Sequence, residues 1–208
     1  MVDIARAVHE AGTVRKAAAH EAEQLGTVLA RAFYDDPQMR WVFPDDARRL
    51  DLIQRGSALF VRKLWLDHGE TYTTENVAGV CVWEPPGKWK VGPRDQLRLL
   101  PSLARVYGRL LPRVLRAFMK LESNHPTEPH YYLPYVGVDP DWQGRGLGAA
   151  LMRPILDRCD ADGVAAYLEA SSPRNRVLYE RHGFVTTEEF FLGPGSPPLW
   201  RMWRAPQS

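Results

Sequence analysis

The chain has 208 residues and a formal net charge of +2 at pH 7, and its length suits one large domain with a sizeable core. Its composition, 45% hydrophobic and 25% charged, is ordinary for a soluble globular protein. So small a net charge gives no strong attraction to nucleic acid or to an anionic membrane. We therefore expect a single domain over residues 1–208 that binds neither.

Cysteine and histidine spacing predicts neither a disulfide framework nor a metal site. The two cysteines, Cys81 and Cys159, lie in separate apolar runs, and the six histidines include no H-x-x-x-H pair. No signal peptide is recognisable, and no apolar run approaches ~18 residues. We expect a cytoplasmic protein without a metal, either a monomer or a homodimer.

The N-terminal half is predicted to combine helices with a few short strands. Residues Met1 to Gly12 leave a short helix and a frayed tail both open. We expect an edge strand at 13–17, an amphipathic helix at 21–33, a helix at 45–68 and strands at 71–74 and 77–84. The first helix ends before Pro37, and the second ends at Gly69. Residues 96–121 are helical in pattern, and Pro101 and Pro112 predict two or three short helices there.

The C-terminal half is predicted to contain four strands and two helices. We expect a strand at 131–138, a helix from Gly146, a strand at 164–170, a short helix at 173–182 and final strands at 184–192 and 198–204. No internal repeat or linker divides the chain. The whole order, β-α-α-β-β-α-β-α-β-α-β-β, predicts one α/β domain with a mixed sheet and helices on its faces.

The most informative stretch runs from Tyr131 to Leu156. An aromatic and β-branched strand leads into a polar connector with glycines, and a helix follows from Gly146. The first N–H groups of a helix have no partner within it, and the helix dipole adds partial positive charge there. The arrangement predicts a phosphate or pyrophosphate site.

Two ligands, and a loop that uses glycines only to turn, compete for this stretch. Gly144, Gly146 and Ala149 fit the dinucleotide pattern G-x-G-x-x-G/A, with Glu169 as the ribose-binding acid. That pattern requires the glycines to follow the strand directly, whereas a connector from Asp139 intervenes. Only residues 149–208 follow, too few for the second half of such a fold, so a dinucleotide is disfavoured.

Two sequence signatures favour the other ligand. Residues 143–148 fit Q/R-x-x-G-x-G/A, and residues 175–184 fit N-x-x-x-Y-E-R-x-G-F. In this order they resemble the signatures of the GNAT superfamily of N-acetyltransferases. More narrowly, the chain is similar to puromycin N-acetyltransferase-like proteins of actinobacteria, through Glu128-Pro129, VGV-x-P-D-x-Q-G-x-G-L-G and LE-x-S-x-PRN-x-x-x-YER-x-GF. The likeness covers about the last eighty residues well and the N-terminal half loosely.

The resemblance implies a fold and a cofactor. The GNAT fold has a central, mostly antiparallel sheet, splayed at the cofactor site, with helices on both faces. The cofactor is acetyl-CoA. Its pyrophosphate is expected on the backbone of Gln143, Gly144, Arg145, Gly146, Leu147 and Gly148, and its pantetheine arm along Val136, Gly137 and Val138. Gly137 fits either a bulge that splays the strand or a crowded core strand, and the Arg145 side chain either contacts phosphate or points into water.

The resemblance also implies catalytic residues. Tyr179 is expected near the coenzyme sulfur, as the general acid for the leaving thiolate. Asn175 either bonds the pantetheine arm or caps its own helix. The general base stays open between His130, Glu128 and Glu84, or a water chain that leads to one of them.

The acceptor is expected to bind against the N-terminal half. Aromatic residues with one acid suit a cationic aromatic amine; the candidates are Phe33, Tyr34, Asp36 and Trp41, with Trp83, Tyr107 and Tyr135 opposite. We expect direct transfer of an acetyl group to the primary amine of a small molecule, without a covalent intermediate. Two alternatives stay open: a protein lysine or N-terminal acetyltransferase, and a regulatory module that binds an acyl-CoA without catalysis.

Overall fold

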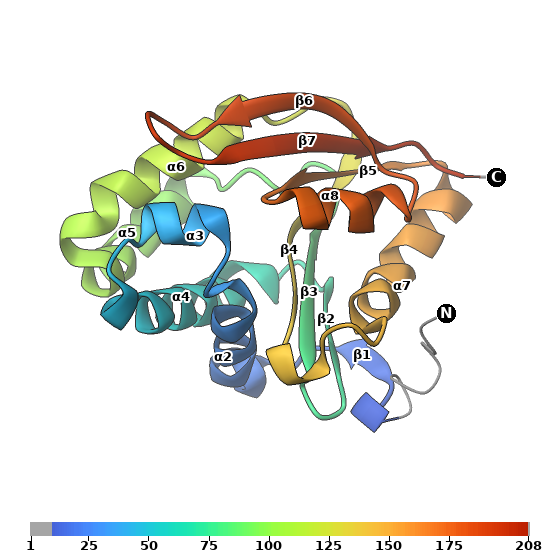
Figure 1. Ribbon diagram of the computed structural model, residues 1–208, viewed down its shortest axis with the longest axis horizontal. Coiled ribbons are helices and arrows are strands. Elements are labelled where there is room, and N and C mark those ends of the chain that lie inside the picture. The colour runs from blue at the N-terminus through green and yellow to red at the C-terminus, as the bar shows by residue number, and fades with distance from the viewer. Residues whose placement is uncertain (1–9, 208) are drawn as a thin grey trace.

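The computed structural model describes residues 10–207, so most of the predicted N-terminal segment lies outside the described residues. The described strands form one sheet in the order β1-β2-β3-β4-β5-β7-β6 (Figure 1). Only the β4–β5 pair is parallel, and the other neighbours are antiparallel. The strands are β1 (Val14–Lys16), β2 (Thr71–Thr74), β3 (Gly79–Glu84), β4 (His130–Val138), β5 (Ala165–Ala170), β6 (Val185–Phe191) and β7 (Pro198–Arg204).

Helices cover both faces of this sheet (Figure 1). Helices α7 and α8 pack on one face, and α2 packs on the other face with α4 behind it. The α-helices are α2 (Ala22–Phe33), α3 (Pro37–Val42), α4 (Asp46–Phe60), α5 (Pro93–Tyr107), α6 (Leu111–Ser123), α7 (Leu147–Asp162) and α8 (Pro173–Glu180). Short helical turns are η1 (Ala19–Glu21), η3 (Gly108–Leu110), η4 (Pro140–Trp142) and the π-helical η2 (Val61–Trp65). The predicted α/β fold with a mostly antiparallel sheet is confirmed.

Strand β3 shows why the sheet needs helices on both sides. Every residue from Gly79 to Glu84 is buried. Cys81 and Trp83 join the core under α7, whereas Val80 and Val82 join the core under α2. Successive side chains of a strand point to opposite faces of the sheet, so a strand that is buried along its whole length needs an apolar layer on each face.

Helix α3 was not predicted, and it matters for the site. Asp36 accepts hydrogen bonds from the backbone N–H groups of Gln38 (2.9 Å) and Met39 (3.2 Å), and Pro37 occupies the first turn. An aspartate cap followed by proline is a favourable helix start. The proline therefore starts a helix, where the sequence prediction used it only to end one.

Two predicted helix boundaries were wrong. Pro101 lies inside α5, and the break between α5 and α6 falls at Gly108, which has a φ of +51°. Pro101 has no N–H to donate to the carbonyl of Leu97, four residues earlier, which belongs to an exposed residue. The helix predicted to run to His68 ends as an α-helix at Phe60 and continues as η2. Among residues 10–207, no helix has both the length and the apolar character needed to cross a bilayer.

Candidate functional site

The site is built around an opening between β4 and β5. The two strands pair only from His130 opposite Ala165 to Tyr132 opposite Tyr167. Beyond that point β4 continues along β3 alone, and β5 continues along β7 alone. Figure 1 shows β4 running away from β5 below their paired ends. One edge of β4 from Leu133 to Val138 is thus free of a strand partner, as the splayed sheet requires.

The irregularity in β4 lies at Leu133 and Pro134. Two steps along β3, from Val82 to Glu84, correspond to three steps along β4, from Tyr135 to Tyr132. Of the two interpretations left open for Gly137, the bulge was wrong and the crowded core strand is correct, because Gly137 pairs in regular register with Val80. A Cβ on Gly137 would lie 3.0 Å from Ala32 and 3.1 Å from Leu29. The glycine lets α2 pack tightly on the strand.

The loop between β4 and α7 keeps its backbone open. The Gln143 amide donates to the Val138 carbonyl (3.0 Å) and ties the loop to the strand. Gly144 and Gly146 have φ values of +78° and +83°, in the left-handed region that favours glycine. Gly146 is the N-cap of α7, and no side chain caps this helix. The N–H groups of the first turn therefore remain available, with the positive end of the helix dipole behind them.

Gly148 lies in the first turn of α7 and is not crowded. The nearest neighbour that a Cβ there would meet is Val138, at an ordinary 3.8 Å. Leu147 is 1% exposed and can offer only its backbone N–H. The Arg145 guanidinium lies on the outer side of the loop, 3.2 Å from both Glu10 and the Asp141 carbonyl, and over the Trp142 ring. Its predicted contact with phosphate stays a prediction.

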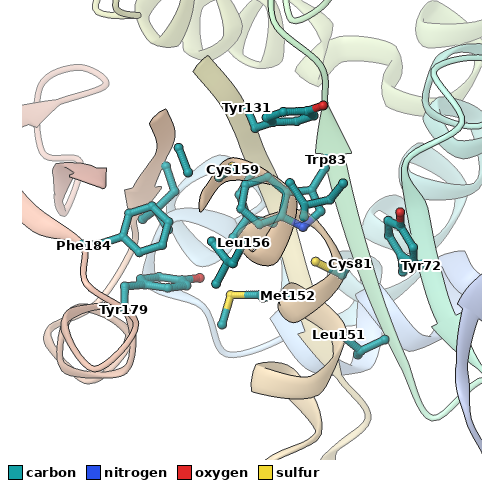
Figure 2. Packing of buried hydrophobic residues seen from close by; sticks show 14 of the residues in the cluster. Tyr72, Cys81, Trp83, Tyr131, Leu151, Met152, Leu156, Cys159, Tyr179 and Phe184 are labelled. Atoms are coloured by element: carbon teal, nitrogen blue, oxygen red, sulfur yellow. The ribbon is translucent and has the colours of Figure 1, made fainter. Parts of the chain in front are cut away.

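Tyr179 projects from α8 toward α7. Figure 2 shows its ring below Phe184, with the hydroxyl pointing toward the side of Met152 and Cys81. The hydroxyl forms no hydrogen bond with any atom of residues 10–207, and its oxygen is not fully buried. Burial raises the pKa of Tyr179, with smaller contributions from Cys81 and Asp36. The phenol is therefore protonated and has no hydrogen-bond partner among residues 10–207.

Asp36 joins α3 to the end of β5. One carboxylate oxygen caps α3, and the other accepts a hydrogen bond from the Ser171 hydroxyl, which follows β5 directly. Burial raises the pKa of Asp36, and these hydrogen bonds oppose the rise. The Asn175 amide lies 3.4 Å from the same hydroxyl, while Ser172 provides the cap of α8. Asn175 is therefore free of the capping role that we left open for it.

The predicted acceptor residues divide into two groups. Phe33 packs edge-on against Tyr135, with ring centroids 5.5 Å apart, on the α2 side of the opening. Tyr34 and Trp41 instead face other helices. The Tyr34 hydroxyl donates to the Asp46 carbonyl (3.3 Å), and the Trp41 ring lies under Arg113. Trp83 is 0% exposed in the core beneath α7, so it does not line a pocket.

The proposed bases His130 and Glu128 lie at the paired end of β4. His130 is 1% exposed, and both of its ring nitrogens are engaged. Nδ1 is 2.6 Å from the Glu128 carbonyl oxygen, and Nε2 is 2.9 Å from Nε2 of His125. Burial lowers the pKa of His130. The Glu128 side chain is on the surface. Their catalytic roles stay predictions, and the geometry favours an indirect one for His130.

Two further buried carboxyl groups, those of Glu84 and Glu169, lie near the ends of β4 and β5 that pair with each other. Burial raises the pKa of Glu84, at the end of β3, and of Glu169, on β5, each to about 7. Trp65 opposes the rise at Glu84. Sequence reasoning considered Glu169 only as a ribose-binding acid. The signal that it missed was a single acid inside an otherwise apolar strand.

Comparisons with known proteins agree with this geometry. The model of the Acetyltransferase (GNAT) family matches residues 30–184. An uncharacterized N-acetyltransferase of Schizosaccharomyces pombe is 27% identical over 207 residues, covering 93% of this chain and 83% of the yeast protein. A Corynebacterium glutamicum structure, described as histone acetyltransferase HPA2 and related acetyltransferase, is 25% identical with a TM-score of 0.69, covering 95% of this chain and 98% of its own.

A more distant structure shares the fold. The polyamine N-acetyltransferase of Drosophila melanogaster, which catalyses the formation of N-acetylagmatine, is 16% identical with a TM-score of 0.58. The alignment covers 93% of this chain and 99% of the fly protein. With the splayed strands, the open loop and the family match over residues 30–184 in agreement, this chain is an acyltransferase that belongs to the Acetyltransferase (GNAT) family.

Proposed function

We propose that this enzyme moves an acetyl group from acetyl-CoA to the primary amine of a small cationic molecule, by direct attack and without a covalent enzyme intermediate. One observation carries the proposal. At the opening between β4 and β5, the charge of the Asp36 carboxylate contributes to the raised pKa of the unpaired Tyr179 phenol. A proton donor and an anionic group face a gap that a thioester arm can enter.

The donor would be held by backbone rather than by charged side chains. Acetyl-CoA supplies the acetyl group as a thioester. The uncapped first turn of α7, with open space at Gly148, suits its pyrophosphate. Peptide groups of β4 that point away from β3 are free to pair with the amide-bearing arm, as in strand addition. An N–H group on this edge also stabilises the negative charge that develops on the carbonyl oxygen during attack.

Tyr179 serves as the general acid. The leaving group is a thiolate, which needs a proton or a strong hydrogen bond as its bond to carbon breaks. Since burial raises the pKa of Tyr179, the phenol carries its proton at neutral pH. Its hydroxyl has no competing partner among residues 10–207, so the proton is available to the departing sulfur.

Asp36 serves to hold the cationic acceptor. Its carboxylate is fixed by the α3 N–H groups and by Ser171, and the Phe33 and Tyr135 rings stand on the same side of the opening. A fixed carboxylate beside aromatic rings attracts an ammonium group on an apolar arm. The Drosophila relative is named for polyamine acetylation, which supports a cationic small molecule here as well.

The test is amine-dependent release of free coenzyme A, followed with a thiol reagent. Agmatine, spermidine, tyramine and a lysine-containing peptide are the acceptors, and Tyr179→Phe is the control. We expect release with at least one small amine and a large loss in the variant. Release with the peptide alone would identify a protein acetyltransferase. Acetyl-CoA binding by calorimetry without release from any acceptor would identify a binding module.

A further inference from the structure

The buried carboxyl group of Glu169 has no role in the steps above. Its side chain is only 5% exposed. Its backbone lies just past Tyr167, the last β5 residue that pairs with β4, so it borders the opening. Atom Oε1 is fully buried and has no hydrogen-bond partner among residues 10–207. An unpaired buried carboxylate oxygen costs stability, and such a cost points to a ligand that supplies the missing donor.

Glu169 and Asp36 both act on Tyr135 of β4. The phenol of Tyr135 is influenced by both carboxylates, and together with burial they raise its pKa to about 12. Four groups face Glu169 itself: Tyr132 of β4, Tyr167 of β5, Arg201 of β7, and His125 of the loop before β4. Arg201 is already paired with Glu188 of β6 (2.6 Å).

The hydrogen bonds of two histidines fix which nitrogen faces Glu169. Because a carbonyl oxygen can only accept, Nδ1 of His130 must carry the hydrogen that it donates to Glu128. Nε2 of neutral His130 is then an acceptor, so Nε2 of His125 must donate to it. This leaves Nδ1 of His125 without a hydrogen, 3.9 Å from Oε1 of Glu169.

An unprotonated nitrogen opposite the carboxyl group favours the protonated acid. Both histidines stay neutral, because burial lowers their pKa values, that of His125 to about 3. Trp89 stacks on the His125 ring with centroids 3.7 Å apart and holds it in place. Burial raises the pKa of Glu169 to about 7, while Tyr167, Tyr132 and Arg201 oppose the rise. A carboxylate of this basicity suits proton removal near neutral pH.

We propose that Glu169 takes the proton from the acceptor's ammonium group, and that His125, held by His130, positions and tunes it. The inference rests on the proposed function. An N–H bond of the ammonium breaks, an O–H bond forms on Oε1, and a neutral amine faces a neutral carboxylic acid. The amine lone pair then attacks the acetyl carbon, so that a C–N bond forms and the C–S bond breaks. Tyr179 gives its proton to the departing thiolate, and the second proton that the nitrogen loses returns to the phenolate, which leaves only the proton on Glu169. Water that enters as the products leave takes the proton away.

The pH dependence of kcat/KM for agmatine, spermidine or tyramine tests the role of Glu169. The wild-type profile should rise to a plateau with an apparent pKa near 7. In Glu169→Gln we expect a loss of about 100-fold or more at pH 7 and no plateau. The rate should instead climb about tenfold per pH unit toward the amine's own pKa, since only amine already neutral in solution can react.

Two further variants separate catalysis from structure. In His125→Phe, an aromatic ring that can stack remains but Nδ1 is lost. The rising limb of the kcat/KM profile, near pH 7 in the wild type, should therefore move to lower pH. A merely structural role would lower the plateau and leave the limb in place. Glu84→Gln removes the other buried carboxyl group with a pKa of about 7, and the limb should persist.

Each outcome decides between the two proposals. If the limb persists in Glu169→Gln, or disappears in Glu84→Gln instead, Glu169 is not the base and the inference alone is wrong. Calorimetry must show that Glu169→Gln binds acetyl-CoA like the wild type; weakened binding would make it part of the donor site and would also overturn the inference. If the wild type transfers to none of the three amines, the proposed function fails and the inference fails with it.

Discussion

Replacing Gly148 with alanine should separate the stability of the fold from its affinity for coenzyme A. The new Cβ would meet no neighbour nearer than Val138 at 3.8 Å, so the folded protein accommodates it. Gly148 lies in the first turn of α7, where alanine is the better helix former, by roughly 0.5–1 kcal/mol in a helix interior. The melting temperature of the free protein should therefore stay the same or rise slightly.

Affinity should change in the opposite direction. The same methyl group would occupy the space in front of the helix start, where we place the pyrophosphate. Displacing the phosphates from the N–H groups should weaken coenzyme A binding at least tenfold, equivalent to about 1.4 kcal/mol. Calorimetric titration with coenzyme A measures this directly, and thermal unfolding without ligand measures stability.

Gly163 provides the matched control at the other end of α7. Its φ is +67°, and an added Cβ has nothing within 4 Å. Alanine there should cost about 1–2 kcal/mol of stability through backbone strain alone and leave affinity unchanged. If Gly148→Ala binds coenzyme A as tightly as the wild type, the start of α7 does not approach the pyrophosphate closely and the assignment is refuted.

Three more predictions concern the site and the fold. Tyr179→Phe should lower kcat about 100-fold with unfolding free energy within about 0.5 kcal/mol of the wild type; an unchanged kcat would remove the phenol as acid. Gly137→Ala should lower the unfolding free energy by about 1–3 kcal/mol in urea denaturation, because Ala32 is 3.0 Å from the new atom. Hydrogen bonds from Arg15 and Ala18 hold the pKa of Glu21 down at about 2, against an ordinary 4.5. That stabilisation is complete above pH 4.5 and is lost as the pH falls toward 2, so Glu21→Gln should flatten the acid limb of the stability profile; an identical limb would contradict it.

The strand, loop and helix of the proposed donor site could be predicted because their determinants are local in the sequence. The strand, loop and helix that end at Asp162 follow one another without interruption, and glycines stand at the two left-handed positions, Gly144 and Gly146. Each of these features acts through the backbone of its own segment. The strand, the loop and the helix can therefore be predicted together from one continuous segment of sequence.

The acceptor half could not be predicted in the same way. Asp36 and Ser171 are 135 positions apart, and only the packing of α3 against the end of β5 brings them together. From the sequence, Trp83 is a candidate for the acceptor pocket because it is aromatic. Every residue of β3 is buried, so its sequence has no alternation of polar and apolar residues. Without that alternation, the sequence does not indicate which face of the sheet Trp83 occupies.

The opening is also where several local rules of stability are broken together. Pro134 interrupts the hydrogen bonding of a central strand, Gly146 leaves a helix start uncapped, and Glu169 keeps an unpaired carboxylate oxygen away from water. Each of these costs stability, whereas Arg204 of β7 and Asp160 of α7 form a complete two-bond pair at 2.7 Å. Costs that meet at one opening are explained most simply if ligands repay them: the pantetheine arm takes the free strand edge, the pyrophosphate takes the helix start, and the amine gives its proton to Glu169.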